Sequence, residues 1–437
     1  MFYYYLKLAS KSIKRTPWLS GLMMLAIALG IGACMTTITV NYLMSANPIP
    51  EKSDQLYYVQ LDSWSPHFAA REPNEPPDQL TWTDATNLMQ AQQAFRQSAM
   101  ASSGGVVQPD NPDVKPFMAS LRLNFADFFP MFNAPFLYGS GWQYSDDVAR
   151  KQVAVISKET NDRVFGGENS VGKSITIAGE MFTVVGVLDE WVLVPRFYDV
   201  TTGAFSETED VFIPFYMKQV MQLSNGGNTN CWKSPEGEGF EAFLMSECIN
   251  YQMWVELPTD ADRDAYMTFL NAYVDEQKAL GRFPRPHNNR LSDVMTWMET
   301  EEVVADDAQI MMYMAFLFLF VCILNTVGLL LSKFATRNGD VALRRAIGAT
   351  KSAIFAQYIT ETALIGLIGG VLGLALASLG LQAIESLYGD FISELVHLDA
   401  TMVVLSFGIA ITASVLAGCY PAWRVCSIPP ASQLKTQ

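Results

Sequence analysis

Residues 167–174 read GENSVGKS and match G-x-x-x-x-G-K-[ST], the pattern of the phosphate-binding loop in nucleotide hydrolases. Such a loop binds phosphate when it leaves a strand and opens a helix, because the amides of the helix N-terminus then point at the anion. Here a helix-like segment, 158–165, precedes the match and an alternating, strand-like segment follows it. The order is reversed, so we interpret the match as a turn.

Two cysteines, Cys231 and Cys248, lie in a long acidic segment, whereas the other four lie in apolar stretches or in the basic C-terminal end. If the acidic segment is extracytoplasmic, as the charges below indicate, its compartment is oxidising. We therefore favour a disulfide, which would contribute about 3 kcal/mol in the chain-entropy model. Two free thiols remain the alternative, because spacing alone does not show that the Cα atoms approach.

The remaining chemistry-bearing residues form no recognisable catalytic or metal-binding pattern. The 437-residue chain has only three histidines, and we find no nucleophile–base pair and no metal-ligand spacing. We therefore expect no catalytic, cofactor or metal site in this chain. The formal net charge of −15 also argues against a nucleic-acid partner, which requires a basic surface.

Four segments are free of charge for long enough to cross a bilayer, which takes roughly 20 helical residues. Buried helices of a large soluble protein are the alternative, but four such runs favour membrane spans. The first run is too long for a cleaved signal peptide and is interpreted as a retained anchor. The apolar stretches lie at about 18–43, 310–331, 362–384 and 400–423.

Charge indicates how these spans are oriented. The residues before the first span, between the second and third, and after the fourth hold eleven basic residues and one acid. The segment 51–307 holds 18 basic and 38 acidic residues, a balance of −20. The positive-inside rule then places both termini in the cytoplasm and the large acidic domain outside a bacterial inner membrane.

The long acidic segment has the signals of a mixed α/β domain. Strands are expected at 151–157, 174–177, 182–188, 211–215 and 252–257, and helices at 158–165 and 260–280, the second capped by Thr259. Residues 291–308 contain no Gly or Pro, and we expect them to form a helical stalk continuous with the second span.

The basic stretches suggest two short helices. Residues 1–15 are expected to form an amphipathic helix at the lipid surface, with Phe2, Leu6, Ala9 and Ile13 on its apolar face; a disordered leader is the alternative. Between the second and third spans, a turn at residues 338–339 precedes a short helix that could dock into a partner's groove, unless the stretch is only a topogenic loop. The residues assigned to this coupling helix are Asp340, Val341, Leu343, Arg344, Arg345, Ile347 and Gly348.

The third span carries small residues and one carboxylate. Gly366/Gly370 and Gly369/Gly373 are small-x-x-x-small pairs, which let helix backbones approach closely, although glycine is also common in spans generally. Glu361 lies near the inner end. It is a functional membrane carboxylate, or else it simply reaches water at the interface or pairs with Arg344, Arg345 or Lys351.

These features give the expected fold class, an α-helical membrane protein with four transmembrane helices and a large α/β periplasmic domain inserted between helices one and two. The expected bounds are a cytoplasmic amphipathic helix at 1–15, spans at 16–45, 310–332, 353–385 and 400–423, the periplasmic domain with its stalk at 46–309, a coupling loop at 333–352, a periplasmic loop at 386–399 and a cytoplasmic tail at 424–437.

Residues 337–350, RNGDVALRRAIGAT, together with Gln357 and Glu361, resemble the inner-loop signature of FtsX-like permeases. The Gly-rich third span, the end at 418–434 and LGIG at 29–32 fit the same family. VAVIS at 153–157, FG at 165–166, VGK at 171–173 and GEMFTVVGV at 179–187 resemble the MacB-type periplasmic core domain. The sequence departs from the family at Asp340, where Glu is usual, and over about 190–290.

The resemblance implies a permease subunit of a MacB-like, type VII ABC transporter that acts as a mechanotransmitter in efflux of a peptide, macrolide or similar amphiphile. It implies a cytoplasmic ABC ATPase carrying ATP-Mg, a second permease protomer, alike or related, a periplasmic membrane-fusion adaptor and an outer-membrane channel. We expect the ATPase on a separate polypeptide, since the chain begins about 15 residues before its first span. Two alternatives remain: an FtsX-like regulator of periplasmic cell-wall hydrolases, and a lipoprotein-releasing permease.

Overall fold

The computed structural model describes residues 2–109, 111–304, 306–388 and 400–427. The chain divides into two compact units, one formed by residues 1–44 with 304–437 and one by residues 45–303. We call them the membrane unit and the outer unit. Most of the loop expected at 386–399 and the tail beyond residue 427 lie outside the described residues.

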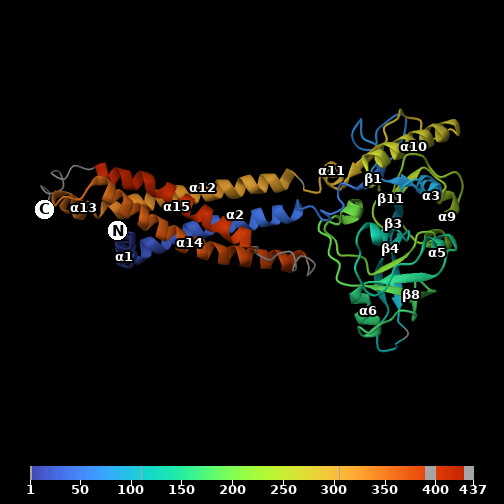
Figure 1. Ribbon diagram of the computed structural model, residues 1–437, viewed down its shortest axis with the longest axis horizontal. Helices are drawn as coiled ribbons and strands as arrows, with labels where there is room; N and C mark the ends of the chain where they lie inside the picture. Colours follow the sequence, from blue (N-terminus) through green and yellow to red (C-terminus); the bar gives the residue numbers. More distant parts are fainter. Residues whose placement is uncertain (1, 110, 305, 389–399, 428–437) are drawn as a thin grey trace. The chain divides into compact units, whose positions relative to one another are not determined.

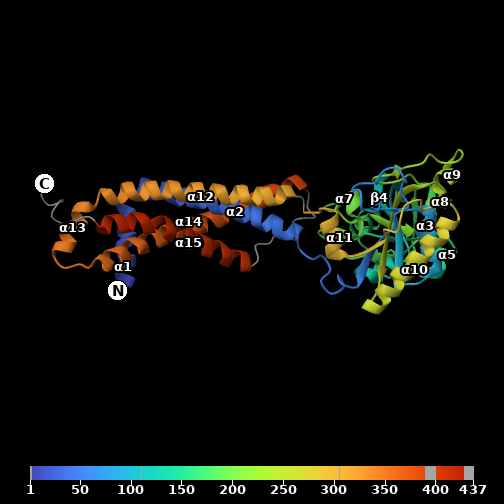
Figure 2. The same ribbon diagram turned by 90° about the horizontal axis from the view of Figure 1, so that it is seen from above.

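Long apolar helices lie side by side in the membrane unit (Figures 1 and 2). Within the described residues, four helices are long and apolar enough to cross a membrane, which confirms the expected class. Large apolar side chains remain exposed along them, as lipid-facing surfaces require. The helices of this unit are α1 (Phe2–Arg15), α2 (Pro17–Met44), α12 (Asp306–Ala335), α13 (Asn338–Ala346), α14 (Lys351–Tyr388) and α15 (Ala400–Ser427).

One glycine pair of α14 lies against α15. A β-carbon at Gly366 would collide with the Ser414 hydroxyl oxygen and lie 2.9 Å from the Ala410 carbonyl oxygen. At Gly370 it would lie 2.8 Å from the Ala410 β-carbon. These distances are too short for any side chain, so this pair permits the close approach of the two helices.

The other pair lies against α2. A β-carbon at Gly369 would lie 2.8 Å from Ile27 Cγ2, and one at Gly373 would lie 2.9 Å from Ile31 Cβ. Residues three positions apart on a helix are rotated by roughly 60°, so the two pairs turn toward different neighbours. α14 is thus packed tightly between α2 and α15.

α1 is helical, in place of the disordered leader considered above, but its apolar face is used differently from the expectation. The helix packs on α14, and Ala9 is buried there with Ser12. Tyr3, Tyr4 and Leu6 stay exposed. The expected lipid-facing surface is therefore wrong at Ala9, because protein rather than lipid covers that position.

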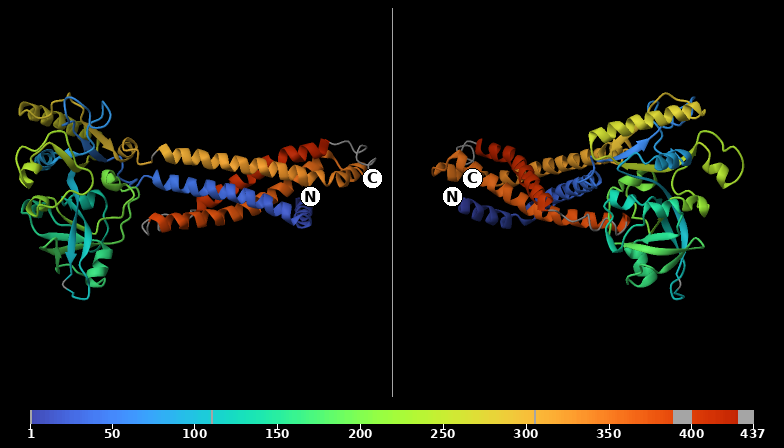
Figure 3. Two further views of the ribbon diagram at one scale, coloured as in Figure 1. Left: turned by 180° about the vertical axis from the view of Figure 1, so that it is seen from behind. Right: turned by 45° about the vertical axis from the view of Figure 1, so that its right-hand side comes forward.

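A mixed sheet forms the centre of the outer unit, with α10 and α6 at opposite ends (Figure 3). Its main strand order is β12-β1-β11-β3-β4-β9-β6-β8-β5, with β4–β9 and β6–β8 parallel and the other pairs antiparallel. Hydrophobic clusters pack against the sheet. The strands are β1 (Leu56–Gln60), β2 (Leu80–Thr81), β3 (Arg96–Gln108), β4 (Phe117–Asn124), β5 (Phe136–Gly139), β6 (Val153–Ile156), β7 (Ser174–Ile177), β8 (Glu180–Leu188), β9 (Val211–Pro214), β10 (Asn230–Cys231), β11 (Cys248–Glu256) and β12 (Arg290–Asp293).

Short helices join these strands, and only α10 is long. Thr259 caps α10: its hydroxyl accepts the Asp262 amide, and the Asp262 carboxylate accepts the Thr259 amide. This reciprocal pair satisfies amides that the first helical turn would leave free. The helical segments are α3 (Trp82–Ala91), α4 (Phe128–Met131), α5 (Tyr144–Val148), α6 (Lys158–Phe165), the 3₁₀ helix η1 (Phe197–Asp199), α7 (Val200–Gly203), α8 (Met217–Val220), α9 (Phe240–Leu244), α10 (Asp260–Ala279) and α11 (Val294–Thr300).

The phosphate-loop match at 167–174 connects helix α6 to strand β7. It does not open a helix, so no helical N-terminus is available there to hold phosphate. The structure thus agrees with the interpretation of this sequence as a turn.

The continuous stalk expected at 291–308 is wrong. Its first residues form β12, and α11 ends at Thr300, after which Glu302 adopts a positive φ of 49°. The Val303 amide donates back to the Met298 carbonyl at 3.0 Å, a bond that closes the end of the helix. Trp297 is fully buried and stacks on Tyr58, so packing into the outer unit overrides the helical propensity of the longer stretch.

The packing of α14 predicts that Gly366→Ala lowers the unfolding temperature of the full chain in detergent. Overpacking costs roughly 1–3 kcal/mol, and besides the Ser414 side chain the added β-carbon meets the Ala410 carbonyl, which is backbone that cannot move aside. Gly408→Ala in α15 is the matched control, because nothing lies within 4 Å of its added β-carbon. This control should retain or slightly gain stability, since alanine favours helix by about 1 kcal/mol. Equal unfolding temperatures for the two variants would contradict the close contact.

Candidate functional site

Helix α13, together with its C-cap residue Ile347, exposes an apolar pair at one end of the membrane unit. Leu343 is 56 % exposed and Ile347 is 79 % exposed, and they lie one helical turn apart. Val341 and Ala342 are buried against the bundle. Two apolar side chains that remain open to solvent on an anchored helix form a surface on which another protein can pack.

Glycine and arginine fix the position of α13. Gly348 ends the helix with a φ of 108°, a conformation that side chains disfavour. Arg344 donates to the Gln357 side-chain oxygen at 2.8 Å, and Arg345 donates to the Cys426 carbonyl at 3.2 Å. The two arginines therefore tie α13 to α14 and α15, while the apolar pair stays free to make contacts.

Glu361 is fully buried inside the bundle, where Lys333 of α12 is its closest charged partner. The Lys333 Nζ atom lies 2.7 Å from Glu361 Oε1 and donates to the Ser20 hydroxyl at 2.9 Å. The Ser12 hydroxyl donates to Glu361, and Arg337 lies 3.7 Å from its other oxygen. One ion pair thus connects α1, α2, α12 and α14.

The predicted partners of Glu361, namely Arg344, Arg345 and Lys351, are wrong. Glu361 lies ten residues after the start of α14, which is about 15 Å along the helix at 1.5 Å per residue. Arg344 reaches only Gln357, one turn earlier. Lys333 was not identified from the sequence, although its place at the charged end of an otherwise apolar helix could have drawn attention to it.

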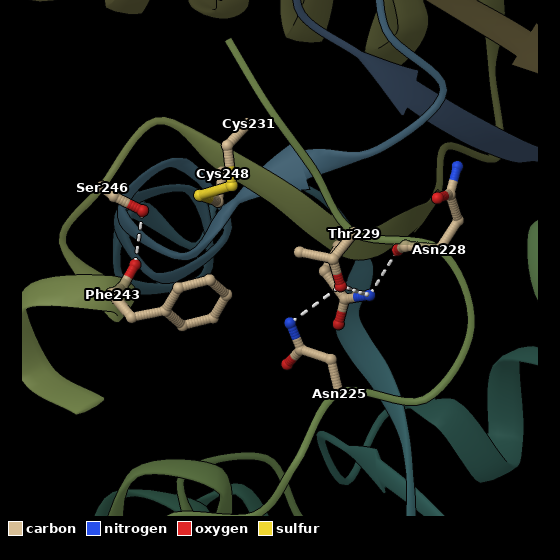
Figure 4. Close-up of a disulfide and its surroundings, with 8 residues drawn as sticks. Asn225, Asn228, Thr229, Cys231, Phe243, Ser246 and Cys248 are labelled. Atoms are coloured by element: carbon tan, nitrogen blue, oxygen red, sulfur yellow. Dashed lines mark hydrogen bonds between the residues drawn. A yellow bond between two sulfur atoms is a disulfide. The ribbon is translucent and has the colours of Figure 1, made fainter. Parts of the chain in front are cut away.

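Cys231 and Cys248 form a disulfide in the outer unit (Figure 4). The two residues lie directly opposite each other on β10 and β11, with their Cα atoms 4.1 Å apart. The loop that precedes β10 is also fixed in place by hydrogen bonds. Asn250 donates to the Asn228 carbonyl at 2.6 Å, and Asn225 donates to the Thr229 hydroxyl at 3.0 Å. The bridge therefore fixes this loop to the sheet edge.

A buried arginine in the outer unit was missed by the sequence analysis. Arg122 of β4 is fully buried and donates to Asp199 at 2.5 Å and, through Nε, to Glu209 at 2.9 Å. Although burial itself raises the pKa of Glu209, Arg122 and Arg196 lower it to about 2. These groups hold the η1 region on the sheet. Within the described residues, no group of His, Cys, Asp or Glu is placed to bind a metal.

The buried pair predicts a large effect of Glu361→Gln on unfolding of the full chain in detergent. Removing one partner leaves the Lys333 charge buried and uncompensated, which costs about 3–5 kcal/mol. The double variant Lys333→Met/Glu361→Gln should recover much of this loss, because neither charge of the fully buried pair remains and Arg337 is partly exposed. Lys351→Met, which removes an exposed lysine, serves as the control. A double variant no more stable than the single one would refute this account.

The disulfide predicts the masses of the alkylated, denatured chain. Of six cysteines, the four free ones should be alkylated before reduction and all six after it. Closing a loop between residues 17 positions apart should stabilise the outer unit by about 3 kcal/mol. The Cys231→Ser/Cys248→Ser variant should lose that stability and show no change on reduction. Six labels before reduction would exclude the bridge.

Two family models together match most of the chain. The model described as MacB-like periplasmic core domain matches residues 20–272, and that described as FtsX-like permease C-terminal matches residues 312–430. The boundary between the matches falls where the outer unit gives way to α12.

Curated relatives are similar over long stretches. A macrolide export ATP-binding/permease protein MacB of Marinobacter nauticus is 23 % identical over 321 residues, covering 73 % of this chain and 44 % of the relative. A pyoverdine export ATP-binding/permease protein PvdT of Pseudomonas savastanoi pv. phaseolicola is 22 % identical over 440 residues, covering 97 % and 58 %. The chain thus spans about half the length of the curated relatives it matches.

Among solved structures, the periplasmic region of MacB from Actinobacillus actinomycetemcomitans aligns with 58 % of this chain and 95 % of its own length, at 15 % identity and a TM-score of 0.37. The family models carry the assignment, because the first alone spans more than half of the chain. With its apolar helices, inserted α/β unit and short basic helix, the chain belongs to the FtsX-like ABC transporter permeases that carry a MacB-like periplasmic core domain.

Proposed function

We propose that this chain is a non-catalytic permease subunit that relays the work of a cytoplasmic ABC ATPase to its periplasmic domain and so drives efflux. The observation that carries the proposal is the exposed Leu343–Ile347 pair on α13. Nothing within the described membrane unit covers this pair, and a partner's groove would bury it. ATP-Mg would bind the ATPase and not this chain.

The charge distribution supports the orientation that this function needs. The basic stretches around α1, α13 and the end of α15 would face the cytoplasm, and the acidic outer unit would face the periplasm of an inner membrane. Both termini are then cytoplasmic. In this orientation α13 lies on the side where ATP is available.

The packing of the helices supports a mechanical relay. A displacement of α13 would pass to α14 and α15 through Arg344 and Arg345. Because Gly369 and Gly373 have no side chains, α14 packs directly against α2. A movement of α14 would therefore displace α2 as well. α2 and α12 are the two segments that connect covalently to the outer unit. Motion at α13 would thereby be transmitted to the outer unit.

The names of the relatives suggest the cargo class. One is named for export of macrolides and another for export of pyoverdine. We propose a peptide, macrolide or similar amphiphile as substrate, with a second permease protomer, a periplasmic adaptor and an outer-membrane channel as further partners. The acidic outer unit would favour cationic parts of such cargo.

A photo-cross-linking residue at Ile347 of the full chain in native membranes tests the docking step. The expected product is a covalent adduct with a protein that mass spectrometry identifies as an ABC ATPase with its own phosphate-binding loop. The same residue placed at Leu416, an exposed position within span α15, is the control and should give no such adduct.

Substitutions on α13 provide the functional readout. Leu343→Asp and Ile347→Asp should each reduce ATPase association at least tenfold, because a buried hot-spot side chain contributes about 2 kcal/mol or more and about 1.4 kcal/mol is a factor of ten. Ser352→Asp adds the same charge at an exposed site outside α13 and should leave association unchanged. Unaltered association in both α13 variants would refute the proposed docking surface.

A further inference from the structure

A second feature lies beside the docking surface. A cavity of about 210 Å³ opens between α1, α13 and the first turns of α14. Four basic side chains line it, those of Lys11, Arg15, Arg337 and Arg344, with Asp340 as the one acidic residue in the lining. The coupling described above uses the Arg344–Gln357 contact in its wall but not the space of the cavity itself.

The positive charge of the cavity is only partly neutralised. Arg15 and Asp340 are 3.8 Å apart and both are exposed, so this ion pair is weak. Arg344 donates to a neutral amide rather than to a carboxylate. Lys11 has no ion-pair partner within the part of the chain that the structure describes. An anion entering the cavity would therefore meet uncompensated cations.

The contact between Arg337 and Glu361 does not neutralise the positive charge of the cavity. Arg337 donates to the Ser12 backbone carbonyl at 3.3 Å and lies 3.7 Å from the Glu361 carboxylate. Glu361, however, is already paired with Lys333 at 2.7 Å. The carboxylate thus has two cations near it, and the cluster around the cavity remains net positive.

The position of the cavity indicates which anion is available. Lys11 and Arg15 lie in the last turns of α1, just before α2 begins at Pro17, and Arg337 follows the end of α12 by two residues. The cavity therefore lies where spans meet the headgroup layer. Leu8, Val341 and Ile354 supply an apolar part of its wall.

The exposed surface of α2, the helix that follows α1 in the chain, fits a lipid chain. Exposed apolar residues Trp18, Leu22, Leu25 and Leu29 follow one another at helical spacing. A tryptophan at the end of such a stripe is typical of a membrane interface. A ligand with a phosphate and an acyl chain would use both the cavity and this surface.

We propose that the cavity binds the phosphate of an anionic phospholipid headgroup, such as that of phosphatidylglycerol. The phosphate contacts Lys11, Arg15 and Arg344, and the bound lipid joins α1 to the coupling helix α13. This inference goes beyond the proposed function, because binding requires neither an ATPase nor a transported substrate. The lipid is a second constraint that holds α13 on the bundle.

Native mass spectrometry of the full chain in mild detergent tests the proposal, with phosphatidylglycerol and phosphatidylcholine as probes. Wild-type protein should retain phosphatidylglycerol in preference to phosphatidylcholine. Lys11→Gln/Arg15→Gln should weaken phosphatidylglycerol binding about 30-fold, because two of the three cations that contact the phosphate lose their charge-assisted hydrogen bonds to it.

The matched control is Lys7→Gln/Lys14→Gln, which removes two cations from the same helix that do not line the cavity. Its affinity should stay within about twofold of wild type, since a detergent micelle offers no charged bilayer surface. If Lys11→Gln/Arg15→Gln does not fold, Arg344→Gln tests the opposite wall of the cavity. Equal losses in both double variants would overturn the site, because the attraction would then belong to the whole helix.

Inorganic phosphate distinguishes a lipid from a free anion. Millimolar phosphate should stabilise the chain against heating far less than phosphatidylglycerol does. Equal stabilisation by phosphate, with no retained lipid, would overturn the lipid assignment. A Leu343→Asp variant that loses ATPase association yet retains phosphatidylglycerol would support lipid binding, even though the two sites share α13.

Discussion

The ion pair between Lys333 and Glu361 is the interaction on which the membrane unit most depends. Both side chains are fully buried, and the pair joins α12 to α14 while Ser12 and Ser20 bring α1 and α2 to it. Charges in such a place are tolerated only when each is paired and hydrogen-bonded. The pair therefore specifies one arrangement of these four helices. Apolar packing alone would let the helices slide along one another.

The glycines of α14 complete that specification. Apolar side chains gain little by leaving lipid for another helix, so close packing has to supply the attraction between spans. Gly366 and Gly370 let α15 pack closely, and Gly369 and Gly373 let α2 pack closely. These contacts make α14 the central helix of the bundle. A helix held on two sides in this way transmits displacement instead of absorbing it, as the proposed relay requires.

The outer unit meets a different physical demand. It has its own sheet and hydrophobic clusters, and the buried Arg122 with its two carboxylates holds the η1 region in place. The Cys231–Cys248 bridge adds a covalent constraint at the edge strand β10. A domain built in this way can move as one body, because its loops are fixed to the sheet by buried polar contacts.

The sequence by itself determined the features that depend on local pattern. Charge-free length marked the four spans, helical periodicity with the Thr259 cap marked α10, and alternating apolar residues marked strands β7 and β8. These signals suffice because each depends on neighbouring residues and on the cost of placing charge in lipid. The family signature around α13 was also visible, since it is contiguous.

Only the tertiary structure decided which distant residues meet. Glu361 pairs with Lys333 and not with the nearer arginines, because the helical rise carries it past them and the bundle turns it toward α12. The prediction of a continuous stalk is wrong for a similar reason, because burial of Trp297 against Tyr58 outweighs a helix-permissive sequence. The partners of a buried charge and the end of a helix under tertiary packing depend on contacts that no local pattern encodes.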